Sequence, residues 1–223
     1  MNWSQMTALY GGRFDPPHSS HRSVAEGLFT TPGIKNVIVI PCGNPAHRPT
    51  VTDASERLIL AQHTFAGLEN VYVDDFEVEA AKNNPHRPSY TYDTIRHFSA
   101  QLNECAFVIG SDQLEFFHLW YRFEELLTLC HWIVLERAGF ADTEIHIASL
   151  VAIGRIVYEE GNTYHIQGCK RILKVCPTIA PAMSATEIRH SIAITGDAPK
   201  NSLIPSVESY VRAHGFYGMN PSP

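Results

Sequence analysis

The stretch GGRFDPPHSSH, residues 11–21, decides how the rest of this chain is organised. It follows a short apolar run at 7–10 that predicts a first strand, and it leads into a helical pattern over 22–29. Paired glycines allow the backbone to pass close to a ligand because no Cβ stands in the way. Asp15-Pro16-Pro17 is a rigid turn sequence before the helix. The stretch therefore predicts a strand, a tight loop and a helix start.

Two histidines stand at the predicted start of that helix. We expect His18 at or just before the first helical residue and His21 in the first turn, a spacing that can place both imidazoles on one side. A helix N-terminus with exposed N–H groups and two imidazole donors suits an anion, most naturally a phosphate. Spacing alone is more typical of surface or capping histidines than of a functional pair. A metal site is disfavoured because no HExxH spacing occurs.

Composition narrows the class of protein. The length of 223 residues fits a single α/β domain over 1–223. A net charge of −6 argues against a nucleic-acid partner, which favours basic surfaces. Five cysteines without a CxxC pair predict neither a zinc ribbon nor a disulfide framework. Since no apolar run approaches about 20 residues and no signal opens the chain, we expect a cytoplasmic protein with no membrane partner.

The remaining chain alternates strand and helix patterns. Strands are expected at 36–40, 71–73, 105–109, 132–135 and 171–175; helices at 54–68, at about 91–102, ending at 126–130, at 184–194 and from 205 to 214. Residues 74–79 read as the acidic exit of the third strand. The alternation predicts an α/β fold, a Rossmann-like parallel sheet with helices on both faces. Ligands of such sheets bind outside the carboxyl ends of the strands.

Two further segments need separate treatment. Residues 140–167 are less regular, with 145–157 readable as helix or strand and a hairpin turn at 160–162, and we interpret them as a variable insertion. The sequence MSATEIR, residues 183–189, predicts a second helix start, with Ser184 near the N-cap and Glu187 at capping-box spacing. Alone, it fits a capped surface helix.

Taken together, these motifs resemble one family. GGRFDPPHSSH resembles the G-G-x-F-D-P-x-H-x-G-H signature of the nucleotidyltransferase superfamily, with Ser20 in place of the last glycine, and MSATEIR resembles its late I-S-S-T-x-I-R element, with Met183 and Ala185 departing. PCGNPAHRP, PSYTYDT, IGSD followed by WY, and SVESYVRAHGFYG are similar to elements of bacterial nicotinate-nucleotide adenylyltransferases, with Ala46 replacing a proline. The resemblance spans the chain apart from 140–167.

This resemblance implies a nucleotidyltransferase (HIGH-type) fold and a reaction. The AMP moiety of ATP, with Mg²⁺, would pass to nicotinate mononucleotide, giving nicotinate adenine dinucleotide and pyrophosphate in NAD biosynthesis. It implies catalytic roles for His18, His21 and Arg189 at the ATP phosphates. The implied ATP-binding residues are Gly11, Gly12, Phe14, Gly110, Asp112 (to a ribose hydroxyl), Ser184, Thr186 and Arg189. The implied mononucleotide-binding residues are Arg48 (phosphate), Trp120 (stacking on the pyridine), and Thr91 and Tyr121 (backbone N–H groups to the carboxylate). No protein-held metal is implied.

Alternatives stay open at this stage. Nicotinamide mononucleotide or another phosphate acceptor would use the same chemistry, and a nucleotide-binding regulator could have lost it. Trp120 also reads as a core residue, Asp112 as a helix cap and Arg48 as a solvated loop residue. Arg13 either faces the phosphates or points to solvent. Homo-oligomerisation is not decided by the sequence.

Overall fold

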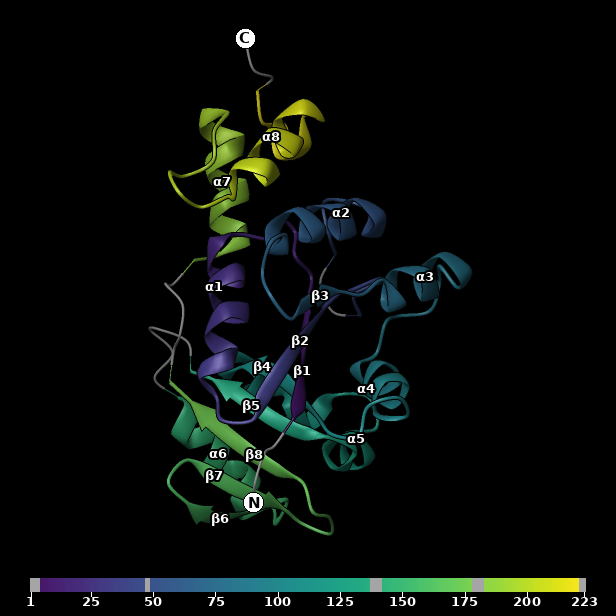
Figure 1. The fold of residues 1–223 in the computed structure, drawn as a ribbon, viewed down its shortest axis with the longest axis vertical. Helices are drawn as coiled ribbons and strands as arrows, with labels where there is room; N and C mark the ends of the chain where they lie inside the picture. The colour runs from purple at the N-terminus through teal and green to yellow at the C-terminus, as the bar shows by residue number, and fades with distance from the viewer. Residues whose placement is uncertain (1–4, 47–48, 137–141, 178–182, 221–223) are drawn as a thin grey trace.

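The computed structural model describes residues 5–46, 49–136, 142–177 and 183–220. Its strands are β1 (Met6–Gly12), β2 (Ile34–Pro41), β3 (Val71–Val73), β4 (Cys105–Gly110), β5 (His131–Leu135), β6 (Ile156–Glu160), β7 (Thr163–Ile166) and β8 (Ile172–Cys176). Its α-helices are α1 (Ser19–Gly27), α2 (Ala54–Phe65), α3 (Phe76–Asn83), α4 (Thr91–Ser99), α5 (Phe123–Leu129), α6 (Thr143–Ala152), α7 (Ala185–Thr195) and α8 (Pro205–Ala213). Short 3₁₀ helices are η1 (Leu28–Thr30), η2 (Ser111–Leu119) and η3 (Phe216–Gly218). Figure 1 shows their arrangement.

All eight strands form one sheet in the order β3-β2-β1-β4-β5-β8-β7-β6. The pairs from β3 to β8 are parallel, which confirms the expected Rossmann-like sheet. The β6–β7 hairpin then adds two strands, with β7 antiparallel to β8. The sheet is therefore mostly parallel, with one antiparallel edge.

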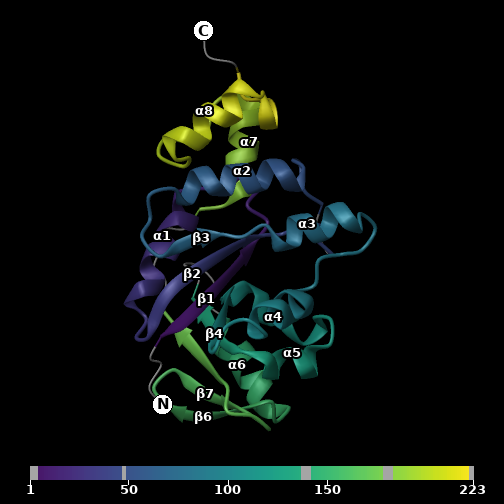
Figure 2. The ribbon, with the colours of Figure 1, turned by 45° about the vertical axis from the view of Figure 1, so that its right-hand side comes forward.

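Alternate residues of the central strands feed two separate cores, because successive side chains of a strand point to opposite faces. In β4, Ala106 and Val108 face the core shared with α1 and α2, whereas Phe107 and Ile109 face the core shared with α4, α5 and α6. Both sets are buried. Helices thus cover both faces of the sheet, as the turned view of Figure 2 shows.

Two expectations need correction or refinement. Residues 74–79 do not form a simple acidic exit: helix α3 begins at Phe76, whose N–H is accepted by Asp74 Oδ1 at 2.8 Å, and Glu77 and Val78 are buried. The less regular region contains α6 and the β6–β7 hairpin, which continue the same sheet. Buried Ile147 and Leu150 of α6 join the α4–α5 core. Whether this region varies within the family stays a prediction.

The last two helices lie beyond one end of the sheet, next to α1 and α2 (Figures 1 and 2). They share a core with α2: Leu60 packs with Ile188 and Ile192 of α7 and with Val207 and Val211 of α8. This packing brings the start of α7 to the start of α1, although more than 160 residues separate them.

Candidate active site

The loops that carry the predicted site residues meet at the carboxyl ends of the parallel strands. β1 lies between β2 and β4, and its last residues, Gly11 and Gly12, are in register with Ile40 and Pro41 of β2. The chain leaves β1 toward β2 on one side, and β4 lies on the other side. This is the strand-order reversal at which open α/β sheets bind ligands.

His18 is the N-cap of α1, and His21 is in the first turn, as expected. The two rings stack with centroids 3.7 Å apart and an angle of 27°. The N–H of His18 donates to His21 Nδ1 at 3.1 Å. This bond places the proton of a neutral His21 imidazole on Nε2, since one ring nitrogen accepts and the other carries the hydrogen. His21 is therefore oriented as a donor.

Phe14 supports this pair from inside the protein. It is 2% exposed and packs edge-on against His21 at 5.0 Å and against Phe65 at 5.8 Å. Gly12 is required for this arrangement, because a Cβ there would lie 2.8 Å from the Phe14 ring. The Phe14 ring thus supports His21, and its expected contact with ATP stays a prediction.

The start of α7 meets the start of α1. Ser184 is the N-cap of α7 and accepts from the Thr186 N–H at 3.2 Å. Arg189 donates to Thr186 Oγ1 at 3.2 Å and to the main-chain oxygen of Asp15 in the loop after β1. Ser19, in the first turn of α1, contacts Met183 Sδ at 3.6 Å. Residues 11–21 and 183–189 therefore lie together in one cluster, which we name the phosphate side; within it His18 is only 4% exposed.

The carboxylate of Asp15 ties the phosphate side to a second loop. It is 2% exposed, and its two oxygens accept from the Val51 N–H at 2.6 Å and the Thr52 hydroxyl at 2.8 Å. These residues follow Arg48, which lies outside the described residues. The loop that follows Arg48 is thus held in place by Asp15 of the GGRFDPPHSSH stretch.

Arg57 on α2 binds the main chain of the same loops. It was not singled out from the sequence. It is 1% exposed and donates to four main-chain oxygens, those of Arg13 (2.8 Å), Cys42 (2.5 Å), Gly43 (2.9 Å) and Thr52 (3.2 Å). Burial lowers the pKa of its guanidinium. An arginine on the apolar face of an otherwise amphipathic helix was the available signal.

The loop after β2 is joined to the segment before α4. Asn44 and Ser89 exchange two bonds, Asn44 N–H to Ser89 Oγ at 2.9 Å and Ser89 N–H to Asn44 O at 2.8 Å. Pro45 pairs with Ser89 in an isolated parallel bridge, and the Asn44 side chain donates to the carbonyls of Pro85 and Arg87. We name residues 42–46, 85–94 and 120–121 the acceptor side.

Glu77 lies beneath this surface. Its carboxylate accepts from the Thr94 hydroxyl at 2.6 Å and from the Gly43 N–H at 3.4 Å, and burial raises its pKa. Burial, and then the charge of Glu77, raises the pKa of the neighbouring Cys42 thiol. A pocket of about 200 Å³ opens beside Glu77, with Tyr90 and Thr94 among its lining residues. The sequence placed Glu77 in the acidic exit of the third predicted strand, so this buried role was missed.

The start of α4 meets the segment after η2. Tyr90, the N-cap of α4, stacks on exposed Tyr121 with centroids 4.4 Å apart. The expected residues Thr91 and Tyr121 are therefore brought together. Trp120 is half-buried and packs on Phe117 at 5.2 Å, so part of its ring belongs to the core.

Asp112 lies at the carboxyl end of β4, in the first turn of η2, where Gln113 donates to it at 3.2 Å. A Cβ on Gly110 would collide with the Asp112 carboxylate, and one on Gly11 would lie 2.8 Å from the Phe107 ring. These glycines are thus explained by packing, and their closeness to a ligand stays a prediction. Arg13 donates to Pro49 O at 3.5 Å, beside the loop after Arg48.

The described part of the chain contains no cluster of three or more His, Cys, Asp or Glu side chains that could hold a metal ion. Nor does it contain a helix long and apolar enough to cross a membrane. The phosphate side includes the imidazoles of His18 and His21, the guanidinium of Arg189 and the hydroxyls of Ser184 and Thr186, which suit an anion.

Residues 9–191 match the cytidylyltransferase-like family. The protein of Yersinia enterocolitica named probable nicotinate-nucleotide adenylyltransferase is 30% identical over 216 residues, which cover 94% of each chain. The chain belongs to the nicotinate-nucleotide adenylyltransferase family, within the cytidylyltransferase-like family. The family member of the same name from Sodalis glossinidius is 31% identical over 221 residues, covering 97% of this chain and 99% of that protein.

Solved structures agree on the fold of this family member. Plasmodium falciparum nicotinic acid mononucleotide adenylyltransferase, complexed with NaAD, superposes with a TM-score of 0.73. The match covers 97% of this chain and 98% of that one at 16% identity. The interpretation of the motifs as those of a nucleotidyltransferase fold is therefore confirmed.

Proposed function

We propose that this protein transfers the AMP moiety of ATP to nicotinate mononucleotide, giving nicotinate adenine dinucleotide and pyrophosphate. The observation that carries the proposal is the junction of two helix starts, those of α1 and α7, through the bond from Arg189 to Asp15. The junction lies beside the acceptor side at the carboxyl end of the sheet. The relatives named nicotinate-nucleotide adenylyltransferase support this reaction over others of the wider family.

The chemistry is an in-line displacement at phosphorus. A phosphate oxygen of the mononucleotide attacks the α-phosphorus of ATP, and the bond to the β-phosphate oxygen breaks, so that pyrophosphate leaves with the electron pair. The attacking phosphate is already ionised at neutral pH, so no general base is needed. Catalysis then rests on positioning and on charge stabilisation.

The phosphate side supplies the positive groups. His21 presents Nε2–H as a donor because its Nδ1 accepts from His18. Arg189 and the N-terminus of α7, with Ser184 and Thr186, hold the β- and γ-phosphates, and His18 contacts the phosphates from α1. Two helix N-termini add their dipoles at this place. Mg²⁺ enters with ATP as part of the substrate rather than in a protein cage.

Other residues hold the two nucleosides. Asp112, at the end of β4, accepts from a ribose hydroxyl, and Gly11, Gly12 and Gly110 allow the backbone to lie near the nucleotide. On the acceptor side, Arg48 binds the mononucleotide phosphate and the exposed part of Trp120 stacks on the pyridine ring.

The acceptor's carboxylate is received by the N–H groups around Thr91 and Tyr121. Thr91 is the first residue of α4, where N–H groups lack intrahelical partners and the dipole favours negative charge. This end of α4 therefore favours nicotinate over the uncharged nicotinamide. ATP as a substrate fits the cytoplasmic location expected from the sequence.

The test is formation of dinucleotide and pyrophosphate from MgATP with nicotinate mononucleotide, run beside the nicotinamide form. We expect strong preference for the acid. Preference for the amide would keep the chemistry and reverse the assignment of the acceptor. Binding of ATP without product from either mononucleotide would contradict the proposed reaction.

A further inference from the structure

A residue from the far end of the chain reaches the centre of the phosphate side. The hydroxyl of Tyr217, in η3, donates to Asp15 Oδ1 at 2.8 Å and lies 3.3 Å from Thr52 Oγ1. Asp15 is the residue whose carbonyl accepts from Arg189 and whose other carboxylate oxygen accepts from Val51. The phenol is thus one hydrogen bond from the residue whose main-chain oxygen holds Arg189 and whose carboxylate holds the loop at 51–52.

The backbone on both sides of this contact is in an unusual conformation. Tyr217 has φ 59° and ψ 9°, in the left-handed region that bulky residues rarely adopt, and Phe14, just before Asp15, has φ 51°. Such outliers persist only when surrounding contacts hold them, and they gather at functional sites. Partial burial and the charge of Asp15 raise the pKa of the Tyr217 phenol, so it stays protonated as the donor.

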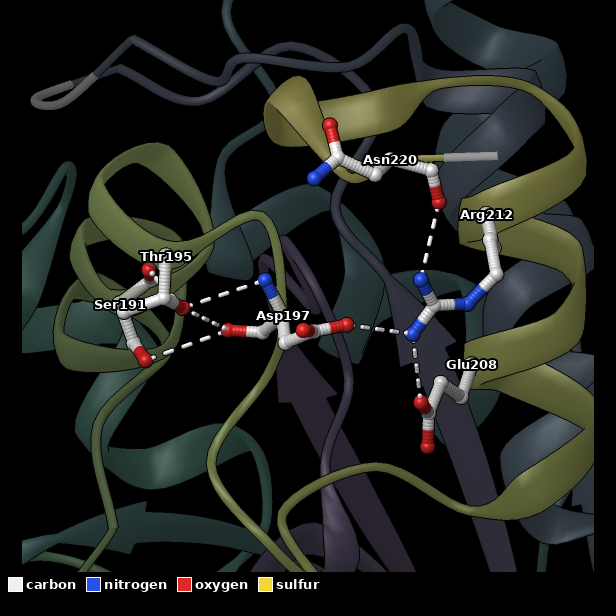
Figure 3. A network of polar contacts seen from close by, with 6 residues as sticks. All are labelled: Ser191, Thr195, Asp197, Glu208, Arg212 and Asn220. Carbon is white, nitrogen blue, oxygen red and sulfur yellow. Dashed lines mark hydrogen bonds and ion pairs between the residues drawn. The ribbon is translucent and has the colours of Figure 1, made fainter. Parts of the chain in front are cut away.

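The segment that carries Tyr217 is itself fastened on both sides. Arg212 of α8 donates to Asn220 O and Asp197 Oδ1, both at 2.9 Å, and to Glu208 at 3.0 Å. Figure 3 shows this network. Met219 is 2% exposed in the core shared by α2, α7 and α8. The segment after α8 therefore presents Tyr217 at a defined place relative to α7.

We propose that Tyr217 is a positioning residue for nucleotidyl transfer, which holds the Asp15 carboxylate so that Arg189 and the loop at 51–52 keep their places around the phosphates. This inference rests on the proposed function. In this proposal, the C-terminal segment helps to set the geometry of the site. The residue acts through Asp15 and does not itself contact substrate.

The chain offers a matched control in Tyr210. Its hydroxyl also donates to a carboxylate, Glu56 Oε2, at 2.9 Å, and it also belongs to the C-terminal region. Its bonds do not reach the loop after β1. Removing either hydroxyl deletes one phenol–carboxylate bond, so a purely structural role predicts similar effects for the two variants.

The experiment compares Tyr217→Phe and Tyr210→Phe for kcat and KM of both substrates, alone and combined with Arg189→Lys. We expect Tyr217→Phe to lower kcat/KM for ATP by about ten- to a hundredfold, because small misplacements of catalytic groups are costly. Tyr210→Phe should stay within about twofold, as substitutions away from special features do. In the Arg189→Lys background, the Tyr217→Phe effect should largely disappear, since coupled residues are not additive.

Several outcomes would overturn the inference. Wild-type kinetics in Tyr217→Phe, equal losses in the two phenylalanine variants, or full additivity with Arg189→Lys would each do so. Where turnover is too slow to measure, the affinity for ATP, measured by calorimetry, gives the same comparison of single and double variants. A wild-type protein that binds ATP and forms no product would instead contradict the proposed function, and the binding cycle would still decide the role of Tyr217.

Discussion

The histidine pair of the phosphate side and the loops of the acceptor side differ in how they are held. On the phosphate side, the orientation of His21 depends on a bond to His18, three residues away. On the acceptor side, Asn44 is held by Ser89 and Gly43 by Glu77, which are 45 and 34 residues away. The first arrangement is made within one stretch of chain, and the second needs α3 and α4 to be packed before it exists.

This difference has a consequence for function. In a local arrangement, activity is lost when one of the residues that form it is changed. In an arrangement of distant segments, activity is also lost when a buried residue that holds the segments together is changed, even though that residue touches no ligand. Arg57 connects the two sides, because it binds carbonyl oxygens of both the loop after β1 and the loop after β2. Variants can therefore be chosen that affect one side alone or both sides together.

The largest effect is expected on the phosphate side. His21→Ala removes the Nε2–H donor, and the loss of one preorganised donor typically lowers kcat by about 10²–10³-fold. Product formation and thermal unfolding should be measured together. His190→Ala is the control, since His190 is an exposed histidine on α7. Near-normal turnover in a folded His21→Ala protein would remove the proposed role.

Arg57→Lys tests the connection between the sides. Lysine keeps the charge and loses the fork that reaches four carbonyls. We expect kcat/KM to fall by about tenfold for both substrates, because both loops shift. The free energy of unfolding should fall by about 1–3 kcal/mol, because buried carbonyls lose a partner.

Arg22→Lys is the matched control for Arg57→Lys. Arg22 also donates to main-chain oxygens, those of Thr64 at 2.7 Å and Ala66 at 2.9 Å, at the far end of α2. This variant should lose stability and keep its kinetics. Effects of Arg57→Lys confined to one substrate would show that the two sides are held independently.

Glu77→Gln tests the acceptor side alone. Glutamine keeps an acceptor for the Thr94 hydroxyl and replaces the oxygen that accepts from the Gly43 N–H with an NH₂ donor. We expect a KM for the mononucleotide raised by about threefold, about 0.7 kcal/mol, as for one weakened hydrogen bond, with the KM for ATP unchanged. Glu79→Gln on the exposed face of α3 is the control. A change in the KM for ATP alone would contradict the assignment of the two sides.

The same variant has a pH signature. Burial raises the pKa of Glu77 in the folded state above its unfolded value of about 4.3. The wild-type protein therefore loses stability relative to Glu77→Gln as pH rises from that value through the raised pKa, by at most about 1.4 kcal/mol per pH unit. Chemical unfolding of both proteins across this range measures the difference. A constant difference would mean that the Glu77 pKa is unchanged on folding.

The smallest effect is expected at Ser20. It is 6% exposed in the first turn of α1, where the family pattern has glycine. Ser20→Gly should lower stability by about 0.5 kcal/mol through helix propensity. It should change the KM for ATP by no more than about twofold. Ser23→Gly, one turn later, is the control; a large rise in ATP affinity only in Ser20→Gly would show that the serine hinders the nucleotide.

Local patterns predicted most of the fold. The parallel strands, the starts of α1, α4, α7 and α8, and the positions of His18 and His21 follow from hydrophobic period, turn residues and capping, which act within a few residues. Helix α3 was missed because its short sequence carries three charged residues within 76–83, and its burial comes from packing of Val78 and Glu77 against other elements. The place of the β6–β7 hairpin in the sheet also depends on a partner, β8.

By itself, the sequence determined the family, the strand–loop–helix carrying the two histidines, and the existence of a second helix start at Ser184. These are local features, set by the backbone preferences of neighbouring residues. Only the tertiary structure decided that Arg189 reaches Asp15, that Phe14 supports His21, and that Arg57, Glu77 and Tyr217 hold the loops. Such contacts join residues far apart in the chain, and burial removes competing water, so their effect exists only once the sheet and its helices have packed.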